Sequence, residues 1–123
     1  MKVRFGKYGI AFYTNRFVHV DAGATTYYCF AFIRPKYLAN NDEGIYRHEM
    51  LHTRQWWRCI LSFGSKCLSH LVMEVDAYKL QLEYYPATEN RLKYELLYSS
   101  FLAHRYEFSD QLTQEEALKL LRS

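Results

Sequence analysis

The residue pattern changes type about a third of the way along this 123-residue chain, and the change restricts the folds open to it. Residues 3–14, 16–20 and 25–33 are rich in aromatic and β-branched side chains and are separated by short turn segments, which predicts strands. Beyond residue 42, capping residues and Gly or Pro stop signals bound helical segments. This order predicts an α+β fold, with a small N-terminal antiparallel sheet followed by helices.

Capping and stopping residues give the expected helix bounds. Asp42 offers N-cap chemistry to the first long helix. Pro86 is expected to stop the second helix, and Thr88 to cap the third. Thr113 and Glu116 have the spacing of a capping box. The expected helices cover, approximately, residues 43–61, 67–85 and 88–106, and a short segment after residue 113.

Length and composition predict one domain that spans residues 1–123. Half of the residues are hydrophobic, which is enough to form a core. The sequence contains no apolar run of the roughly 18 residues that a membrane helix needs. Its first residues also lack the apolar segment of a signal peptide. We therefore expect a cytoplasmic location and no membrane partner.

Charge and cysteine content restrict the partners further. The net charge is +3. Nucleic-acid binding usually needs a denser basic patch than this chain offers, so no nucleic-acid partner is expected. The three cysteines, Cys29, Cys59 and Cys67, are odd in number and lack CxxC spacing. This pattern favours free thiols in a reducing compartment, with a Cys59–Cys67 link as the alternative.

Residues 48–52 read His-Glu-Met-Leu-His, an HExxH motif within the first expected long helix. Residues four apart lie one above the other on a helix, so the imidazoles of His48 and His52 can reach one ion. Glu49 lies about 100° around the helix from His48, beside such an ion and not on it. A glutamate placed there can take a proton from water and later pass it to a leaving amine.

The same spacing also arises by chance, in ordinary amphipathic helices that carry two surface histidines. A separate basic face of this helix argues against that interpretation. Arg47, Arg54 and Arg58 follow one another at intervals of seven and four, so they share one solvated side. The two histidines lie off that side. We therefore expect them to bind Zn²⁺, with Glu49 as the catalytic general base.

A catalytic zinc site takes three protein ligands and leaves one position open. The next helix carries two carboxylates, Glu74 and Asp76, which point about 200° apart and cannot both reach one ion. Glu74 borders an apolar stripe, where a carboxylate must be paired or metal-bound, so it is favoured as the third ligand. Asp76 is the alternative ligand, or a nearby or surface carboxylate. His70, one turn before Glu74, is either a ligand, a transition-state donor or a residue near solvent.

An HExxH followed after about twenty residues by a helix with Glu-Val-Asp-Ala resembles the gluzincin metallopeptidases. The small size is similar to the minigluzincins and to small phage or bacterial HExxH proteins. The resemblance covers residues 25–85 and implies that Glu74 is the third zinc ligand. It also implies that an edge strand beside the active-site helix aligns the substrate, for which residues 25–33 are the candidate. Some gluzincins orient a histidine with an Asp where this chain has Tyr78, so that orientation must come from elsewhere.

The sequence therefore predicts a zinc-dependent peptidase that hydrolyses a peptide bond in a peptide or protein substrate. It assigns no substrate-binding side chains. The alternative is a catalytically inactive, zincin-like binding or assembly protein with a structural metal. A fourth protein ligand, such as His70, would close the site in that case, because structural zinc sites keep no open position.

Overall fold

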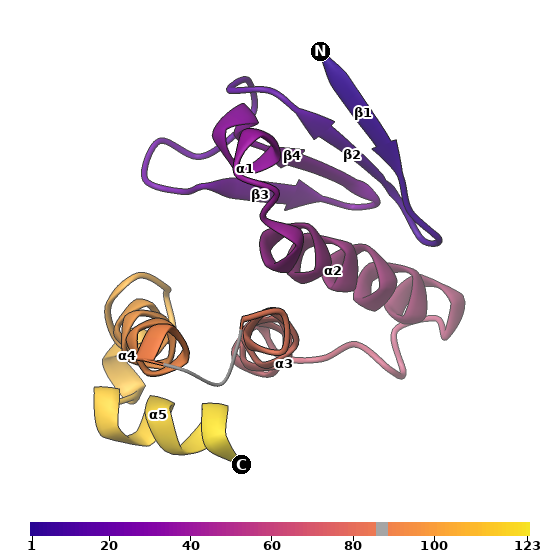
Figure 1. Ribbon diagram of the computed structural model, residues 1–123. Helices are drawn as coiled ribbons and strands as arrows, with labels where there is room; N and C mark the ends of the chain where they lie inside the picture. The colour runs from indigo at the N-terminus through magenta and orange to yellow at the C-terminus, as the bar shows by residue number, and fades with distance from the viewer. Residues whose placement is uncertain (86–88) are drawn as a thin grey trace. The chain divides into compact units, whose positions relative to one another are not determined.

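The computed structural model describes residues 1–85 and 89–123, with the backbone alone at Glu89. The chain divides into two compact units, Met1–Leu68 and Ser69–Ser123, here called the N-terminal and C-terminal units and described separately. Strands come first and helices follow, so the expected α+β class is confirmed (Figure 1). The single domain expected from length stays a prediction. No helix among the described residues is long and apolar enough to cross a membrane.

The N-terminal unit contains one four-stranded sheet in the order β1-β2-β4-β3. Its strands are β1 (Lys2–Phe5), β2 (Ile10–Tyr13), β3 (Ala24–Tyr27) and β4 (Phe30–Ile33). The pairs β1–β2 and β3–β4 are antiparallel hairpins, whereas β2 and β4 run parallel. The sheet is therefore mixed, and not purely antiparallel as expected. The two hairpins lie side by side through their second strands, and these strands point the same way.

Two segments expected as single strands are hairpins. In residues 3–14, the amide of Gly6 donates to the carbonyl of Gly9, which closes the first turn. A Cβ at Gly9 would collide with the carbonyl oxygen of Cys29 and the side chain of Thr53, so only glycine allows this turn to lie so close. In residues 25–33, Tyr28 has a φ of 58° and turns the chain between β3 and β4.

The strand expected at residues 16–20 is wrong, because these residues form bends and turns. The Arg34 side chain donates hydrogen bonds to the backbone carbonyls of Ala22 and His19. The connection between β2 and β3 is thus held by a side chain and not by a neighbouring strand. A β-prone composition does not form a strand where no partner strand is available.

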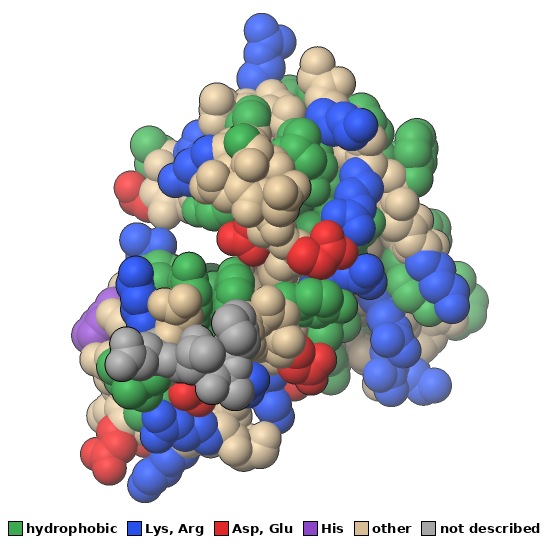
Figure 2. Space-filling model, viewed as in Figure 1, with side chains coloured by type: hydrophobic (Ala, Val, Ile, Leu, Met, Phe, Trp, Pro, Cys, Tyr) green, Lys and Arg blue, Asp and Glu red, His purple; other side chains and the backbone are tan. Residues whose placement is uncertain are grey.

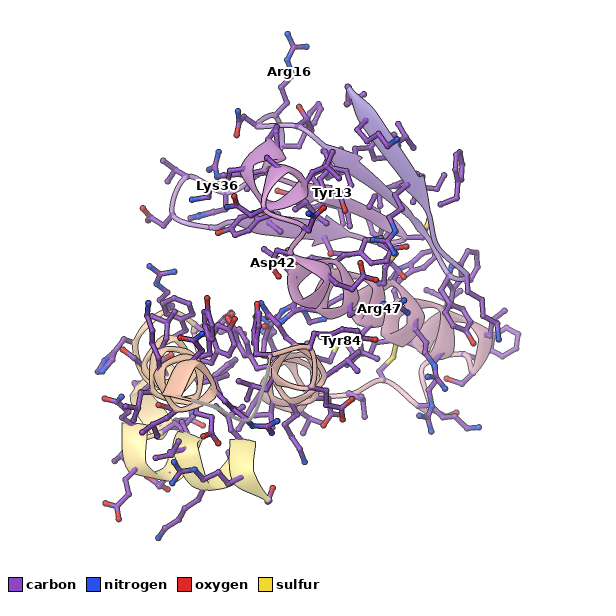
Figure 3. All side chains as sticks on the ribbon, in the orientation of Figure 1. Tyr13, Arg16, Lys36, Asp42, Arg47 and Tyr84 are labelled. Atoms are coloured by element: carbon purple, nitrogen blue, oxygen red, sulfur yellow. A yellow bond between two sulfur atoms is a disulfide. The ribbon has the colours of Figure 1, made fainter. Side chains whose placement is uncertain are left out.

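Two helices follow the sheet in the N-terminal unit. α1 (Pro35–Ala39) was not expected; Pro35 occupies its first turn, where a missing N–H costs nothing. α2 (Glu43–Leu61) has the expected bounds, and the side chain of Asp42 at its start accepts a hydrogen bond from the amide of Ile45 (Figure 3). The helices pack on one face of the sheet around a buried core of Ala11, Tyr13, Ala31, Ile33 and Tyr46 (Figure 1).

A disulfide joins Cys59, near the end of α2, to Cys67. The expectation of free thiols is therefore wrong for this pair, while Cys29 is free. The reason is local: Gly64 has a φ of 87°, and the chain reverses after α2 so that the two Cα atoms lie 4.4 Å apart. The disulfide ties the last residues of the N-terminal unit to the helix that carries the HExxH motif.

Replacing both bridged cysteines, in Cys59→Ser/Cys67→Ser, is expected to destabilise the protein by about 2–3 kcal/mol, because the short closed loop restricts the unfolded chain. Guanidinium unfolding followed by the fluorescence of Trp56 and Trp57, both on α2, measures this change. Cys29→Ser is the matched control and is expected to unfold like the wild type. Equal stability of the double variant and the wild type would contradict the prediction.

The C-terminal unit is helical. It contains α3 (His70–Leu82), α4 (Glu89–His104), the short 3-10 helix η1 (Ser109–Gln111) and α5 (Gln114–Arg122) (Figure 1). Its core is formed by Val75, Tyr78, Leu82, Tyr98, Leu102, Ala117 and Leu121. The apolar stripe expected on the second long helix therefore does face a core, and this fixes the rotation of α3 about its axis.

Capping explains where these helices begin. α3 starts three residues later than expected, because the Ser69 side chain accepts a hydrogen bond from the amide of Val72. The capping box of Thr113 and Glu116 at the start of α5 is confirmed. The stop expected at Pro86 and the cap expected at Thr88 lie outside the described residues.

Candidate metal centre

The HExxH motif lies on an uninterrupted part of α2. His48 and Glu49 are 5% and 7% exposed, and the imidazole ring centroids of His48 and His52 are 4.9 Å apart. The arginines Arg47, Arg54 and Arg58 on the same helix are exposed. The two faces predicted for this helix are therefore confirmed. The interpretation of the motif as two surface histidines does not fit these side chains.

Glu49 is held by the sheet. Its Oε2 accepts a hydrogen bond from the Thr26 hydroxyl on β3, and its Oε1 lies 4.0 Å from His48 Nε2. A hydroxyl that donates to one carboxylate oxygen fixes the plane of the group and leaves the other oxygen available for proton transfer. Thr26 was not singled out from the sequence. Its strand pairing, opposite the buried Ala31, turns it toward α2, and pairing is not visible in a single sequence.

Gln55 orients His52. The Oε1 atom of Gln55 lies 2.9 Å from His52 Nδ1, and Gln55 is itself buried. An amide oxygen only accepts hydrogen bonds, so Nδ1 carries the proton and Nε2 keeps its lone pair for a metal. This contact supplies the histidine orientation that the sequence left open. The three-residue spacing on one helix was the signal for it.

The C-terminal unit holds Glu74 in a polar network. Glu74 is 7% exposed, and its Oε2 accepts a hydrogen bond of 3.1 Å from the Tyr106 hydroxyl. The Tyr106 and Tyr78 hydroxyl oxygens are 2.6 Å apart. Burial raises the pKa of Tyr106, which keeps its hydroxyl protonated as a donor. Asp76, by contrast, is exposed, which favours Glu74 over Asp76 as the functional carboxylate.

His70 contacts two carboxylates. Its Nδ1 is hydrogen-bonded to Glu107, and its Nε2 lies 3.6 Å from Glu74 Oε1. Hydrogen bonding to Glu74 and then to Glu107 raises the His70 pKa, against the lowering effect of burial. The same contact lowers the pKa of Glu107. His70 is therefore placed to hold the Glu74 carboxylate in position. The contacts of Glu107 with His70 and of Tyr106 with Glu74 had no signal in the sequence.

His48, His52 and Glu74 each offer one donor atom of a kind that could hold a metal ion. No protein-family model, curated protein or solved structure matches this chain. The resemblance to gluzincins therefore rests on the two short motifs, and the chemistry of the site has to be argued from its own residues.

Proposed function

We propose that this chain is a zinc-dependent peptidase in which His48, His52 and Glu74 bind Zn²⁺ and Glu49 is the general base. The observation that carries the proposal is the state of Glu49. It is a buried carboxylate beside two imidazoles on one helix face, and it is hydrogen-bonded by Thr26 from the neighbouring strand. The hydrogen bond from Thr26 would satisfy a glutamate with only a structural role, and such a role does not account for the two imidazoles beside it.

The residues present fit a catalytic zinc ion. Two neutral imidazoles and one carboxylate are a ligand set that leaves a coordination position open. The hydrogen bond from His52 to Gln55 fixes the tautomer that binds metal, and Tyr106 restrains the Glu74 carboxylate. When bound there, a zinc ion lowers the pKa of a water molecule and polarises the substrate carbonyl.

The chain's own residues supply the remaining steps. Glu49 accepts a proton from the attacking water at Oε1 and returns it to the leaving nitrogen when the peptide bond breaks. Thr26 keeps Oε2 occupied, so both transfers use the same oxygen. The burial of Glu49 limits competition from bulk water for its proton.

β3 is the strand that we propose aligns the substrate. The candidate segment 25–33 contains two strands, and the strand order makes β3 an edge of the sheet and β4 an internal strand. An edge strand offers unpaired N–H and C=O groups to an extended peptide. Because Thr26 lies on β3, a peptide paired there lies near Glu49. The expected partner is therefore a peptide or an unfolded protein segment.

The disulfide bears on the cellular location expected for this protein. The cytoplasmic location stays a prediction, and the Cys59–Cys67 disulfide argues against it, because disulfides are rare in a reducing compartment.

The test of the function uses untagged protein, because a polyhistidine tag binds zinc itself. Mass spectrometry of the metal content is expected to give one zinc per chain. Incubation with a peptide library from a digested proteome is expected to give new peptide ends. Cleavage should stop with 1,10-phenanthroline and return with added zinc. Bound zinc without cleavage would favour the structural-metal alternative, and absence of zinc after loading would exclude both.

A further inference from the structure

The sheet of the N-terminal unit has a second face, opposite to the one that α1 and α2 cover. Strand alternation and pairing place eight side chains on it, here called the aromatic face: Val3, Phe5, Ile10, Phe12, Thr25, Tyr27, Phe30 and Phe32. None of the eight is charged, and none is buried. The alternate positions on the same strands, such as Ala11 and Ile33, form the buried core.

Four of the five rings of the aromatic face, all except Phe5, form one contiguous cluster. Phe12 stacks on Phe32 with ring centroids 5.5 Å apart, and Phe17 from the β2–β3 connection packs on Phe32 at 5.1 Å. Phe30 and Tyr27 adjoin the same cluster. These contacts join rings from β2, β3, β4 and the β2–β3 connection into one continuous, largely apolar surface.

The exposed area is large for a chain of this size. Phe5, Phe17, Tyr27 and Phe30 are 77%, 68%, 48% and 41% exposed. At roughly 150–250 Å² for each ring, these four side chains alone expose on the order of 500 Å². Each partner in a standard protein interface contributes about 800 Å². Together with Phe17, and with its half-buried members included, the aromatic face is close to that size.

The absence of charge on this face indicates the kind of partner. Residues 1–68 contain ten Lys and Arg against four Asp and Glu, a net charge of +6. Several of these cations lie along α2 (Figure 2), where Arg47, Arg54 and Arg58 share one exposed side of the helix. A nucleic acid needs cations beside the stacked bases, and the eight positions provide none. The centres of protein interfaces, by contrast, are poor in charge and rich in aromatic rings.

Layer packing then favours a second sheet as the partner. A sheet that carries helices on one face and apolar side chains on the other is stable as an inner layer, with another sheet packed about 10 Å away. A second copy of this chain presents the same uncharged aromatic face. Two copies related by a two-fold axis therefore bury both faces at once.

We propose that the aromatic face binds the aromatic face of a second copy, forming a two-fold dimer with stacked sheets. The side chain of Thr26 and the helix α2 lie on the other face of the sheet. This dimer therefore does not cover the side of the sheet on which Glu49 lies. The inference does not depend on metal binding or on peptidase activity.

Salt dependence distinguishes this dimer from other uses of the face. Each N-terminal unit carries a net charge of +6, so two such units that meet repel each other at low salt. Added salt screens this repulsion. The dimer is therefore expected to tighten at high salt, whereas binding to a nucleic acid or an anionic membrane weakens.

The experiment is sedimentation equilibrium of the untagged protein over a wide concentration range, at low and high salt. We expect a monomer–dimer equilibrium that salt strengthens. Phe30→Ser is expected to weaken dimerisation roughly 10- to 30-fold, as truncation of a central aromatic ring does at other interfaces. Phe63→Ser is the matched control, because Phe63 is 100% exposed but lies in the connection after α2. Circular dichroism verifies that both variants are folded.

Several outcomes would overturn the proposal. One is a monomer at every concentration. Another is equal weakening by Phe30→Ser and Phe63→Ser, which would place the contact elsewhere. A third is binding of the monomer to single-stranded oligonucleotides or to phosphatidylserine vesicles that Phe30→Ser abolishes, because the face would then serve a different partner.

Discussion

Glu49→Gln is expected to bind zinc like the wild type and to lose hydrolysis by a factor of about 10²–10⁴, the usual contribution of a positioned general base. The amide has the size of the carboxylate and still accepts the hydrogen bond from Thr26, so the local structure is preserved. It cannot accept a proton from water. The measurements are the zinc content and the cleavage rate of one peptide bond that the wild type cuts.

A control variant separates this effect from a general loss of negative charge. Asp21→Asn removes an exposed carboxylate from the same unit and is expected to leave both readouts unchanged. If Glu49→Gln cleaved the same bond at the wild-type rate, the assignment of Glu49 as the base would be abandoned. Loss of zinc from Glu49→Gln would instead show that Glu49 is a ligand.

The parts of the site that the sequence predicted are those set by neighbours on one helix. The spacing of His48, Glu49 and His52 alone fixes their relative directions, because helix geometry relates residues three and four apart. The start of α2 at Asp42 follows from side-chain capping in the same way. Helix geometry also places Gln55 one turn after His52, so their contact could have been expected. The hydrogen bond itself depends on the rotamer of His52, which spacing does not determine.

The contacts that the sequence did not predict are those between distant residues. Thr26 and Glu49 are separated by 23 positions, and Tyr106 and Glu74 by 32. The first pair depends on strand register, since a slip of one residue would turn Thr25 toward α2 instead. With twelve tyrosines in the chain, composition alone could not single out Tyr106.

The fold shows the same division. The α+β class and the bounds of α2 followed from local patterns and capping. The mixed sheet did not follow from local patterns. It arises because the two hairpins join through the parallel pairing of β2 with β4, and local sequence does not determine which strands of two hairpins pair. The short helix α1 was missed because Pro35 both ends a strand and favours the first turn of a helix.

Glu74→Gln is expected to weaken zinc binding by more than the roughly 10- to 100-fold that loss of an outer contact to a ligand costs. The amide keeps the size of the side chain and still accepts the hydrogen bond from Tyr106, so α3 stays in place. It lacks the negative charge that binds the ion. Competition with a chromogenic zinc chelator measures the dissociation constant directly and needs no substrate.

Asp76→Asn is the matched control, two residues along the same helix. Its side chain is exposed, on the opposite side of α3 from the core, and its removal is expected to leave the zinc dissociation constant unchanged. The reverse result, with Asp76→Asn losing zinc and Glu74→Gln keeping it, would assign the third ligand to Asp76. Equal binding by both variants would mean that His48 and His52 hold the metal without either carboxylate.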